Sequence, residues 1–318
     1  MASTNISTAF VKQYGSTLDL LAQTKGGKFK GTHLEESIEG EEKYYDQLGS
    51  VFATEVTDRY ADSPENDISF ARRRVTATPY DVGLMLDKFD KVKMLINPES
   101  EYVQQQVTAL MRKYDIEFIK GALGTANTGK TGSTPVSLPA SQIIEHNSKS
   151  LTIAKLSEAR ALFEENGVDL DDPLNKAYIA VTPKVIQDML GSTKTTSVDF
   201  NSVKALVKGE LNAFYGFEFI VSNLIPAAKS DNSAILNWTA SDAFDTTNQN
   251  NTDRACFAYV KSGVRQVTNP QIMTEISKRD DKRFNYYAYS CMRTGAVRME
   301  EKKVIQINCK EGTALTDA

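Results

Sequence analysis

One stretch of the sequence matches a known chemical motif. Residues 124–131 read GTANTGKT, which fits the G-x-x-x-x-G-K-[ST] pattern of phosphate-binding loops. In such a loop the backbone N–H groups and the N-terminus of a helix surround the phosphates of a nucleotide. Taken alone, the motif indicates a nucleotide-binding enzyme.

The elements around this motif stand in the wrong order for a nucleotide site. A phosphate loop follows a strand and begins a helix at its Lys-Thr pair, so that the helix N-terminus faces the phosphate. Here a long helical pattern precedes Gly124, and the Gly-Ser-Thr-Pro sequence after Thr131 is a poor start for a helix. We interpret residues 124–132 as a loop rich in glycine and threonine. A nucleotide-binding enzyme that uses residues 124–131 is kept as an alternative.

The side chains most used in catalysis and metal binding are scarce. The 318 residues include 2 His and 3 Cys. His33 and His146 are far apart in the sequence, and neither has a second His or Cys at ligand spacing, which argues against a zinc site. An odd number of widely spaced cysteines argues against a disulfide framework and favours a reducing compartment. We expect no catalytic residue, metal or cofactor, and no enzymatic activity.

Charge is concentrated near the front of the chain. Residues 34–67 contain eleven acidic and two basic residues, and Arg72, Arg73 and Arg74 follow after four uncharged residues. A run of arginines can bind nucleic acid phosphates, but the acidic segment beside it favours pairing between protein surfaces. The residues that we expect to make contacts between subunits are Glu35, Glu36, Glu39, Glu41, Glu42, Arg72, Arg73 and Arg74.

The rest of the pattern predicts a mixed α+β body. The spacing of apolar residues predicts a helix over residues 97–123, with Asn97 and Pro98 at its start, and a second helix over residues 152–166. A strand over residues 178–181 leads into a third helix that ends at Gly191. Four strand-like segments fill the last third, and the pairs Asn269-Pro270 and Thr294-Gly295 indicate turns between them. Nearly the first hundred residues are expected to lie outside any core of their own.

Composition limits the class of protein. The formal net charge is −4, with 41% hydrophobic and 25% charged residues, which is ordinary for a globular chain. No apolar run approaches the ~18 residues of a membrane-spanning helix, and the first fifteen residues are too polar for a secretory signal. We therefore expect a soluble protein that is not exported and has no membrane partner.

Several blocks together resemble the major capsid proteins of tailed double-stranded DNA bacteriophages, in a branch found in short-tailed phages. Their order and spacing carry the resemblance, since each block alone is weak. The blocks are ISTAFVKQY at residues 6–14, LDKFDKVKML at 86–95, IKGALGTA at 119–126, YIAVTP at 178–183, FYGFEFIVS at 214–222 and RTGAVRMEEKKV at 293–304.

The resemblance implies a Hong Kong 97-like capsid fold, whose parts can be assigned to this chain. The expected parts are an N-terminal arm at residues 1–30, an extended loop at 31–93, a peripheral domain at 94–176 with its spine helix at 97–123, an axial domain at 177–262, and peripheral strands with a C-terminal strand at 263–318.

The same resemblance implies a function in assembly. Copies of the chain would form the hexamers and pentamers of an icosahedral shell around double-stranded DNA, without sequence-specific DNA binding. Portal and scaffolding proteins, and a decoration protein, are the further partners that it implies. The expected location is the virion, after assembly in the host cytoplasm. A nanocompartment shell of the same fold is the second alternative.

Overall fold

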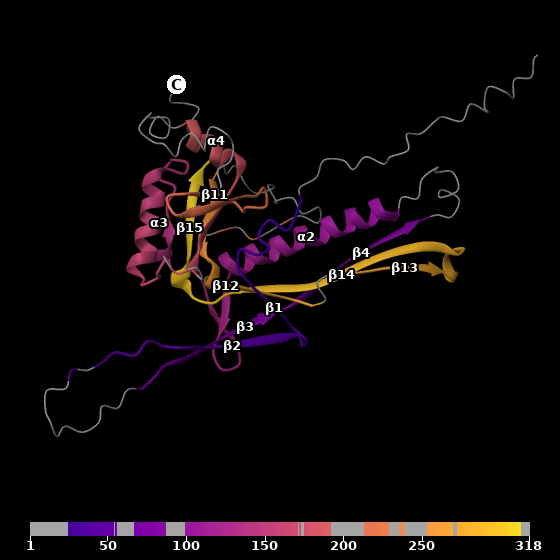
Figure 1. Ribbon diagram of the computed structural model, residues 1–318, viewed down its shortest axis with the longest axis horizontal. Helices are drawn as coiled ribbons and strands as arrows, with labels where there is room; N and C mark the ends of the chain where they lie inside the picture. Colours follow the sequence, from indigo (N-terminus) through magenta and orange to yellow (C-terminus); the bar gives the residue numbers. More distant parts are fainter. Residues whose placement is uncertain are drawn as a thin grey trace, which may run out of the picture.

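The computed structural model is an elongated molecule with a thick body at one end (Figure 1). It describes residues 25–53, 55, 67–86, 99–170, 172, 175–191, 213–228, 234, 236, 238, 253–269 and 272–312. Most of the predicted N-terminal arm, residues 1–24, lies outside the described residues. So do residues 54, 56–66 and 87–93 of the predicted extended loop.

A six-stranded sheet forms the thick body. The strand order is β7-β15-β11-β8-β10-β9, and β11 is antiparallel to both of its neighbours, β15 and β8. Strands β8, β11 and β15 are almost entirely buried, as their runs of β-branched and aromatic residues predict. The bounds are β7 Ile143–Ile144, β8 Ala177–Val181, β9 Ala213–Phe214, β10 Phe217–Val221, β11 Asp253–Val260 and β15 Val304–Lys310.

Two helices accompany this sheet, and the sequence predicts both. Helix α3 (Ile153–Glu165) begins after Thr152, whose side chain accepts a hydrogen bond from the N–H of Lys155, and it ends before Gly167. Helix α4 (Pro183–Gly191) begins after Thr182, which accepts from the N–H of Val185. Lys155 is buried and donates from Nζ to the carbonyls of residues 146, 149 and 308, so it ties α3 to β15.

A long helix and a second sheet build the thin part of the molecule. Helix α2 (Glu99–Leu123) confirms the helix predicted over residues 97–123 for the part that the structure describes, and it lies alongside β4 and β14 (Figure 1). The sheet has the order β1-β12-β14-β13, and β4 pairs with the other edge of β14. The bounds are β1 Leu34–Ser37, β4 Thr78–Leu86, β12 Val264–Thr268, β13 Met273–Arg279 and β14 Asn285–Arg298.

A third sheet has four strands, and two of them form a long hairpin that projects from the body (Figure 1). Its order is β2-β3-β5-β6, with β2 antiparallel to β3. The bounds are β2 Glu42–Leu48, β3 Phe70–Thr76, β5 Ala126–Thr128 and β6 Thr134–Val136. The predicted division of the chain into arm, extended loop, peripheral domain and axial domain stays a prediction.

The predicted turn at Thr294-Gly295 is wrong, because β14 runs straight through both residues. Glycine stands at position 295 for another reason. A Cβ there would lie 2.2 Å from the carbonyl oxygen of Thr76, so only glycine lets β3 pass this close to β14.

The expectation that the first hundred residues lie outside any core is also wrong. Phe29 is fully buried in the core of the body, stacked on Phe118 with ring centroids 4.9 Å apart. A second cluster buries Tyr45 and Val75 of the hairpin against Val267 and Val297. The base of the extended segment therefore belongs to the fold of its own chain.

Candidate functional site

The phosphate-loop sequence forms a hairpin at the wrong end of a helix. Strands β5 and β6 enclose the turn at residues 129–133, and this hairpin follows the C-terminus of α2. Helix C-termini present carbonyl oxygens and a partial negative charge, which attract cations and repel phosphate. The polarity of α2 therefore argues against a phosphate site, as predicted. The prediction of a loop over residues 124–132 is wrong for residues 126–128, which form β5 and pair with both β3 and β6.

A buried arginine occupies this carbonyl end. Arg298 has no exposed side-chain surface, and its Nη1 donates to the carbonyls of Ala122 and Gly124 at 2.8 Å each. Its Nη2 donates to the carbonyl of Val136 at 3.2 Å, which joins β6 to the end of α2. Burial lowers the pKa of Arg298 to about 10, so the guanidinium is still charged at neutral pH. The first glycine of the motif, Gly124, thus binds a cation through its carbonyl oxygen, where a phosphate loop would bind an anion.

The three consecutive arginines lie on two different faces of the β2–β3 hairpin. Side chains alternate along a strand, so Arg72 and Arg74 share the outer face while Arg73 points to the body. On the outer face Arg72 Nε pairs with Asp46 at 2.5 Å, and Arg74 Nη1 pairs with Glu42 at 3.0 Å. Both pairs are partly or largely exposed.

Arg73 serves the fold of the subunit. Its side chain is 8% exposed, and Nη2 donates to both carboxylate oxygens of Glu301 at 2.7 and 2.8 Å. Its Nε donates to the carbonyl of Met299 at 3.0 Å, and Gln47 Nε2 donates to the same carbonyl at 2.7 Å. The inner face of the hairpin is fastened to the segment between β14 and β15 by these bonds.

The predicted acidic contact residues are also distributed unevenly. Glu36 accepts from Lys43, Arg265 and the Tyr45 hydroxyl at 2.6 to 3.1 Å. Partial burial opposes ionisation of Glu36, but these donors outweigh it and hold the pKa of the carboxyl below its usual value.

The other acids in this group have fewer partners. Glu35 accepts from the N–H of Gly31 at 2.7 Å, and Glu42 pairs with Arg74 as described. Glu39 and Glu41 are exposed. The role of all eight predicted residues between subunits stays a prediction.

The sequence analysis missed the exposed apolar residues at the two ends of the molecule. At the outer end of the β2–β3 hairpin, Leu48 is 71% exposed, Phe52 80% and Phe70 76%, and Leu48 lies directly opposite Phe70. At the other end, the turn between β13 and β14 exposes Phe284. The sequence did contain a signal for this surface, because large apolar residues lie inside a strongly acidic segment. An isolated chain gains no stability by exposing such residues, so they indicate an interaction site.

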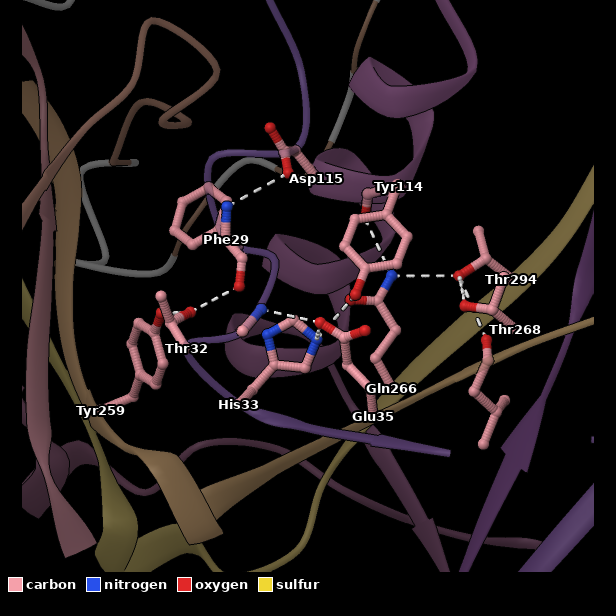
Figure 2. Close-up of polar contacts among 12 residues, drawn as sticks. Phe29, Thr32, His33, Glu35, Tyr114, Asp115, Tyr259, Gln266, Thr268 and Thr294 are labelled. Carbon is pink, nitrogen blue, oxygen red and sulfur yellow. Dashed lines mark hydrogen bonds and ion pairs between the residues drawn. The ribbon is translucent and has the colours of Figure 1, made fainter. Parts of the chain in front are cut away.

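The sequence analysis also missed the anchor of the N-terminal arm on α2. Asp115 on α2 is fully buried, and its carboxylate accepts from the backbone N–H of Lys28 at 3.1 Å. It also accepts from the backbone N–H of Phe29 at 3.4 Å (Figure 2). Gly26 lies against the backbone of α2, since a Cβ there would be 2.1 Å from the carbonyl carbon of Met111. Residues 26–29 at the end of the predicted arm therefore lie against the side of α2.

His33 packs beside this anchor. Its ring stacks on Phe118 with centroids 4.4 Å apart. Its Nε2 lies 3.1 Å from the Tyr114 hydroxyl (Figure 2). Burial lowers the pKa of His33 to about 4, so the ring is neutral at pH 7. Within the described residues no group of His, Cys, Asp and Glu side chains fits a metal ion. In the same part of the chain no helix is long and apolar enough to cross a membrane.

Comparisons with known proteins agree with this architecture. Solved structures with a similar fold include the capsid of cyanophage P-SCSP1u, with 18% identity and a TM-score of 0.69, where 95% of this chain and 93% of that chain are covered. The capsid of Ralstonia phage GP4 shares 10% identity over 94% of this chain and 95% of that chain, with a TM-score of 0.66. The capsid of Helicobacter pylori bacteriophage KHP30 shares 10% identity over 97% of each chain, with a TM-score of 0.65.

Sequence comparison leads to the same family. No curated protein matches the chain. The family model for phage capsid proteins, however, matches residues 6–311, which is nearly the whole chain. The predicted Hong Kong 97-like capsid fold and the predicted structural function are confirmed, and the viral shell is favoured over the nanocompartment and enzyme alternatives. The chain belongs to the phage capsid protein family and is a structural protein of the viral shell.

Proposed function

We propose that this chain assembles with copies of itself into hexamers and pentamers, which close into an icosahedral shell around packaged double-stranded DNA. The observation that carries the proposal is the position of the exposed apolar residues. The outer end of the β2–β3 hairpin and the end of the β13–β14 hairpin lie at opposite ends of the long molecule (Figure 1).

Such an arrangement favours contacts between unlike surfaces of neighbouring copies. Leu48 and Phe70 face each other at the outer end of the β2–β3 hairpin. This end lies at the opposite end of the molecule from the β13–β14 hairpin, which therefore does not cover it within one chain (Figure 1). Burying apolar surface contributes roughly 25 cal/mol per Å², so covering these side chains with a neighbour stabilises the assembly. A contact between two different patches leads to closed rings when the rotation between copies closes. In this proposal each extended hairpin lies over the next copy in a ring.

Charge on the outer face of the hairpin supports a role in register. The Arg72–Asp46 pair is exposed two residues along each strand from Leu48 and Phe70, and the partly exposed Arg74–Glu42 pair lies closer to the base of the hairpin. Exposed charge pairs contribute little to the stability of a subunit, but complementary charges on two surfaces select the correct partner and register. The Arg72 and Arg74 side chains can exchange their partners for acids of a neighbour when subunits meet.

The remaining partners follow from the family. We propose that portal and scaffolding proteins, and a decoration protein, join the shell, and that assembly takes place in the host cytoplasm. A net charge of −4 suits a container for DNA, because a strongly basic wall would bind phosphates tightly.

Electron microscopy of the purified full-length chain tests the proposal. We expect closed shells or rings of five and six subunits from the wild type. The double variant Leu48→Gln/Phe70→Gln should remain as single subunits with unchanged circular dichroism. Tyr215→Gln is the matched control, since Tyr215 is an exposed aromatic residue in the β9–β10 turn, away from the hairpin. Shells from the double variant at the wild-type yield would contradict the proposal.

A further inference from the structure

Helix α2 has one side that faces away from the sheets. Gln106 marks the packed side, because its Oε1 accepts from the Ser290 hydroxyl of β14 at 2.7 Å. Asp115 comes nine residues later, which is about two and a half turns of helix, so it lies on the opposite side. Asp115 accepts from the N–H groups of Lys28 and Phe29. The predicted arm therefore crosses α2 on the side away from β14 (Figure 1).

Three lysines lie in the short part of the arm that crosses α2. Lys25, Lys28 and Lys30 are all exposed. Lys28 Nζ donates to the carbonyl of Val221 at 2.5 Å, which holds this ammonium group against the thick body. Lys25 and Lys30 have no ion-pair partner among the residues that the structure describes. At least two of the three ammonium groups are therefore available to bind a partner.

An arginine of α2 adds to this positive charge. A Cβ at Gly26 would lie 2.1 Å from the backbone nitrogen of Arg112, so the arm runs directly over this arginine. Two acids lie beside the lysines. Asp115 is buried beneath the arm, and Glu35 is exposed and lines the same cleft as Lys30. The three lysines and Arg112, called the basic strip below, form a local excess of positive charge in a chain whose net charge is −4.

The opposite face of the same sheet exposes acids. Ser290 faces α2, so the odd-numbered residues of β14 face away from it. In register with these odd-numbered residues are Asp81 on β4 and Glu275 on β13, and both are exposed. Arg293 shares this face, which therefore carries both signs of charge. The excess of positive charge is thus a property of the α2 side alone.

We infer that the basic strip faces the interior of the shell and contacts the phosphate backbone of the packaged double-stranded DNA. The inference rests on the proposed function, since only a filled shell brings DNA to this surface. Charge complementarity selects the occupant, because DNA carries one negative charge per about 1.7 Å of its axis and lysines bind phosphates without reading sequence. A few such contacts in each subunit hold the DNA weakly, which agrees with a wall that is not strongly basic overall.

Acetylation of lysines in DNA-filled and empty shells tests the contact. Both kinds of particle are treated with an acetylating reagent, and the modification of each lysine is measured by mass spectrometry. We expect Lys25 and Lys30 to be acetylated in empty shells and to lose most of this modification in filled shells at low salt. Lys282 and Lys302 are exposed lysines outside the basic strip, and their modification should not change. Equal modification of Lys25 and Lys30 in both particles would overturn the inference.

Salt dependence distinguishes a phosphate contact from coverage by protein. Counterion release weakens DNA binding as salt rises, and for three lysines a tenfold increase in salt weakens it by roughly 500-fold. We therefore expect the acetylation of Lys25 and Lys30 in filled shells to rise with salt toward the level in empty shells. Protection that persists at high salt would overturn the inference, because it would show that another protein segment covers the lysines.

Dissociated subunits test the charges directly. Fluorescence anisotropy of a short labelled DNA duplex at low salt should show weak binding that is equal for two unrelated sequences. The variant Lys25→Gln/Lys30→Gln should reduce the slope of log affinity against log salt by about 2. Lys282→Gln/Lys302→Gln removes the same charge elsewhere and should keep the wild-type slope. Equal slopes for the two variants, or no binding by the wild type, would overturn the inference.

The results also separate this inference from the proposed function. A wild-type chain that forms no shells, or shells that hold no DNA, would contradict the proposed function itself. Shells that hold DNA while Lys25 and Lys30 react as they do in empty shells would overturn only the contact at the basic strip.

Discussion

Replacing Arg73 and Arg72 separately distinguishes an arginine that stabilises the subunit from one available for assembly. Both residues lie on β3 and are adjacent in sequence, so Arg72→Met is a closely matched control for Arg73→Met. Methionine keeps most of the apolar stem of arginine and removes the charge and the donors. The structure predicts opposite outcomes for the two variants.

The magnitude follows from burial and from the bonds that are lost. Arg73→Met removes two hydrogen bonds to Glu301 and one to the carbonyl of Met299, at a side chain that is 8% exposed. Removing one partner of a buried charged pair costs several kcal/mol, and Glu301 keeps Arg298 at 3.8 Å as a partial replacement. We expect a loss of about 3 kcal/mol in the free energy of unfolding. The Arg72–Asp46 pair is exposed, and its loss should leave the stability of the subunit unchanged.

Urea unfolding of dissociated subunits, followed by circular dichroism, measures the difference. For an m-value of about 3 kcal/mol/M, Arg73→Met should lower the midpoint by about 1 M, while Arg72→Met unfolds at the wild-type midpoint. Particle counts by electron microscopy, taken under conditions where each variant is folded, then report on assembly. Equal midpoints for the two variants would refute the assignment of Arg73 to the fold.

Three further predictions concern the buried charges and the phosphate-loop sequence. Arg298→Met should cost about 3 kcal/mol in urea unfolding, because three carbonyl oxygens at the end of α2 and on β6 lose their donor; a midpoint equal to the wild type would contradict this function of Arg298. Burial raises the pKa of Asp115 from 3.8 to about 6, so the native state binds this proton more tightly and the cost of the buried carboxylate is relieved as the pH falls from 7 toward 4. When the pH is lowered from 7.5 to 5, the urea midpoint of Asp115→Asn should therefore rise less than that of the wild type. The same change of midpoint with pH in both proteins would contradict this function of Asp115. Burial lowers the pKa of His33 to about 4, and this group destabilises both proteins equally on acidification. Calorimetric titration with Mg-ATP should give no binding, whereas a micromolar affinity that disappears in Lys130→Ala would restore the nucleotide site.

Local pattern predicted the regular elements of the body well. Helices α2, α3 and α4 and the strands of the last third follow from apolar spacing and from capping residues such as Thr152 and Thr182. These signals are local, so a single sequence contains them. The same reasoning failed at Thr294-Gly295, because the reason for that glycine is the backbone of Thr76, more than two hundred residues earlier in the chain.

The assignment of the front segment failed for a similar reason. Its charged residues were visible in the sequence, but their partners were not. Arg73 donates to Glu301, and the N–H groups of Lys28 and Phe29 donate to Asp115. These partners are far apart in the sequence, so a local sequence pattern does not reveal them. The alternation of side chains along β3 was predictable from strand geometry, and it would have divided the three arginines into two sets.

Strand β14 has a mechanical consequence for a closed wall. It extends from the β13–β14 turn to the segment that holds Arg73, and along its length it bonds to β13, β4 and β12. Hydrogen bonds between antiparallel strands lie perpendicular to the strand direction. A pull along β14 therefore shears all of these bonds together, whereas a pull across it would open them one after another. A stretching force applied at the β13–β14 turn therefore acts along β14, the direction in which the sheet resists force most strongly, and is transmitted to the thick body.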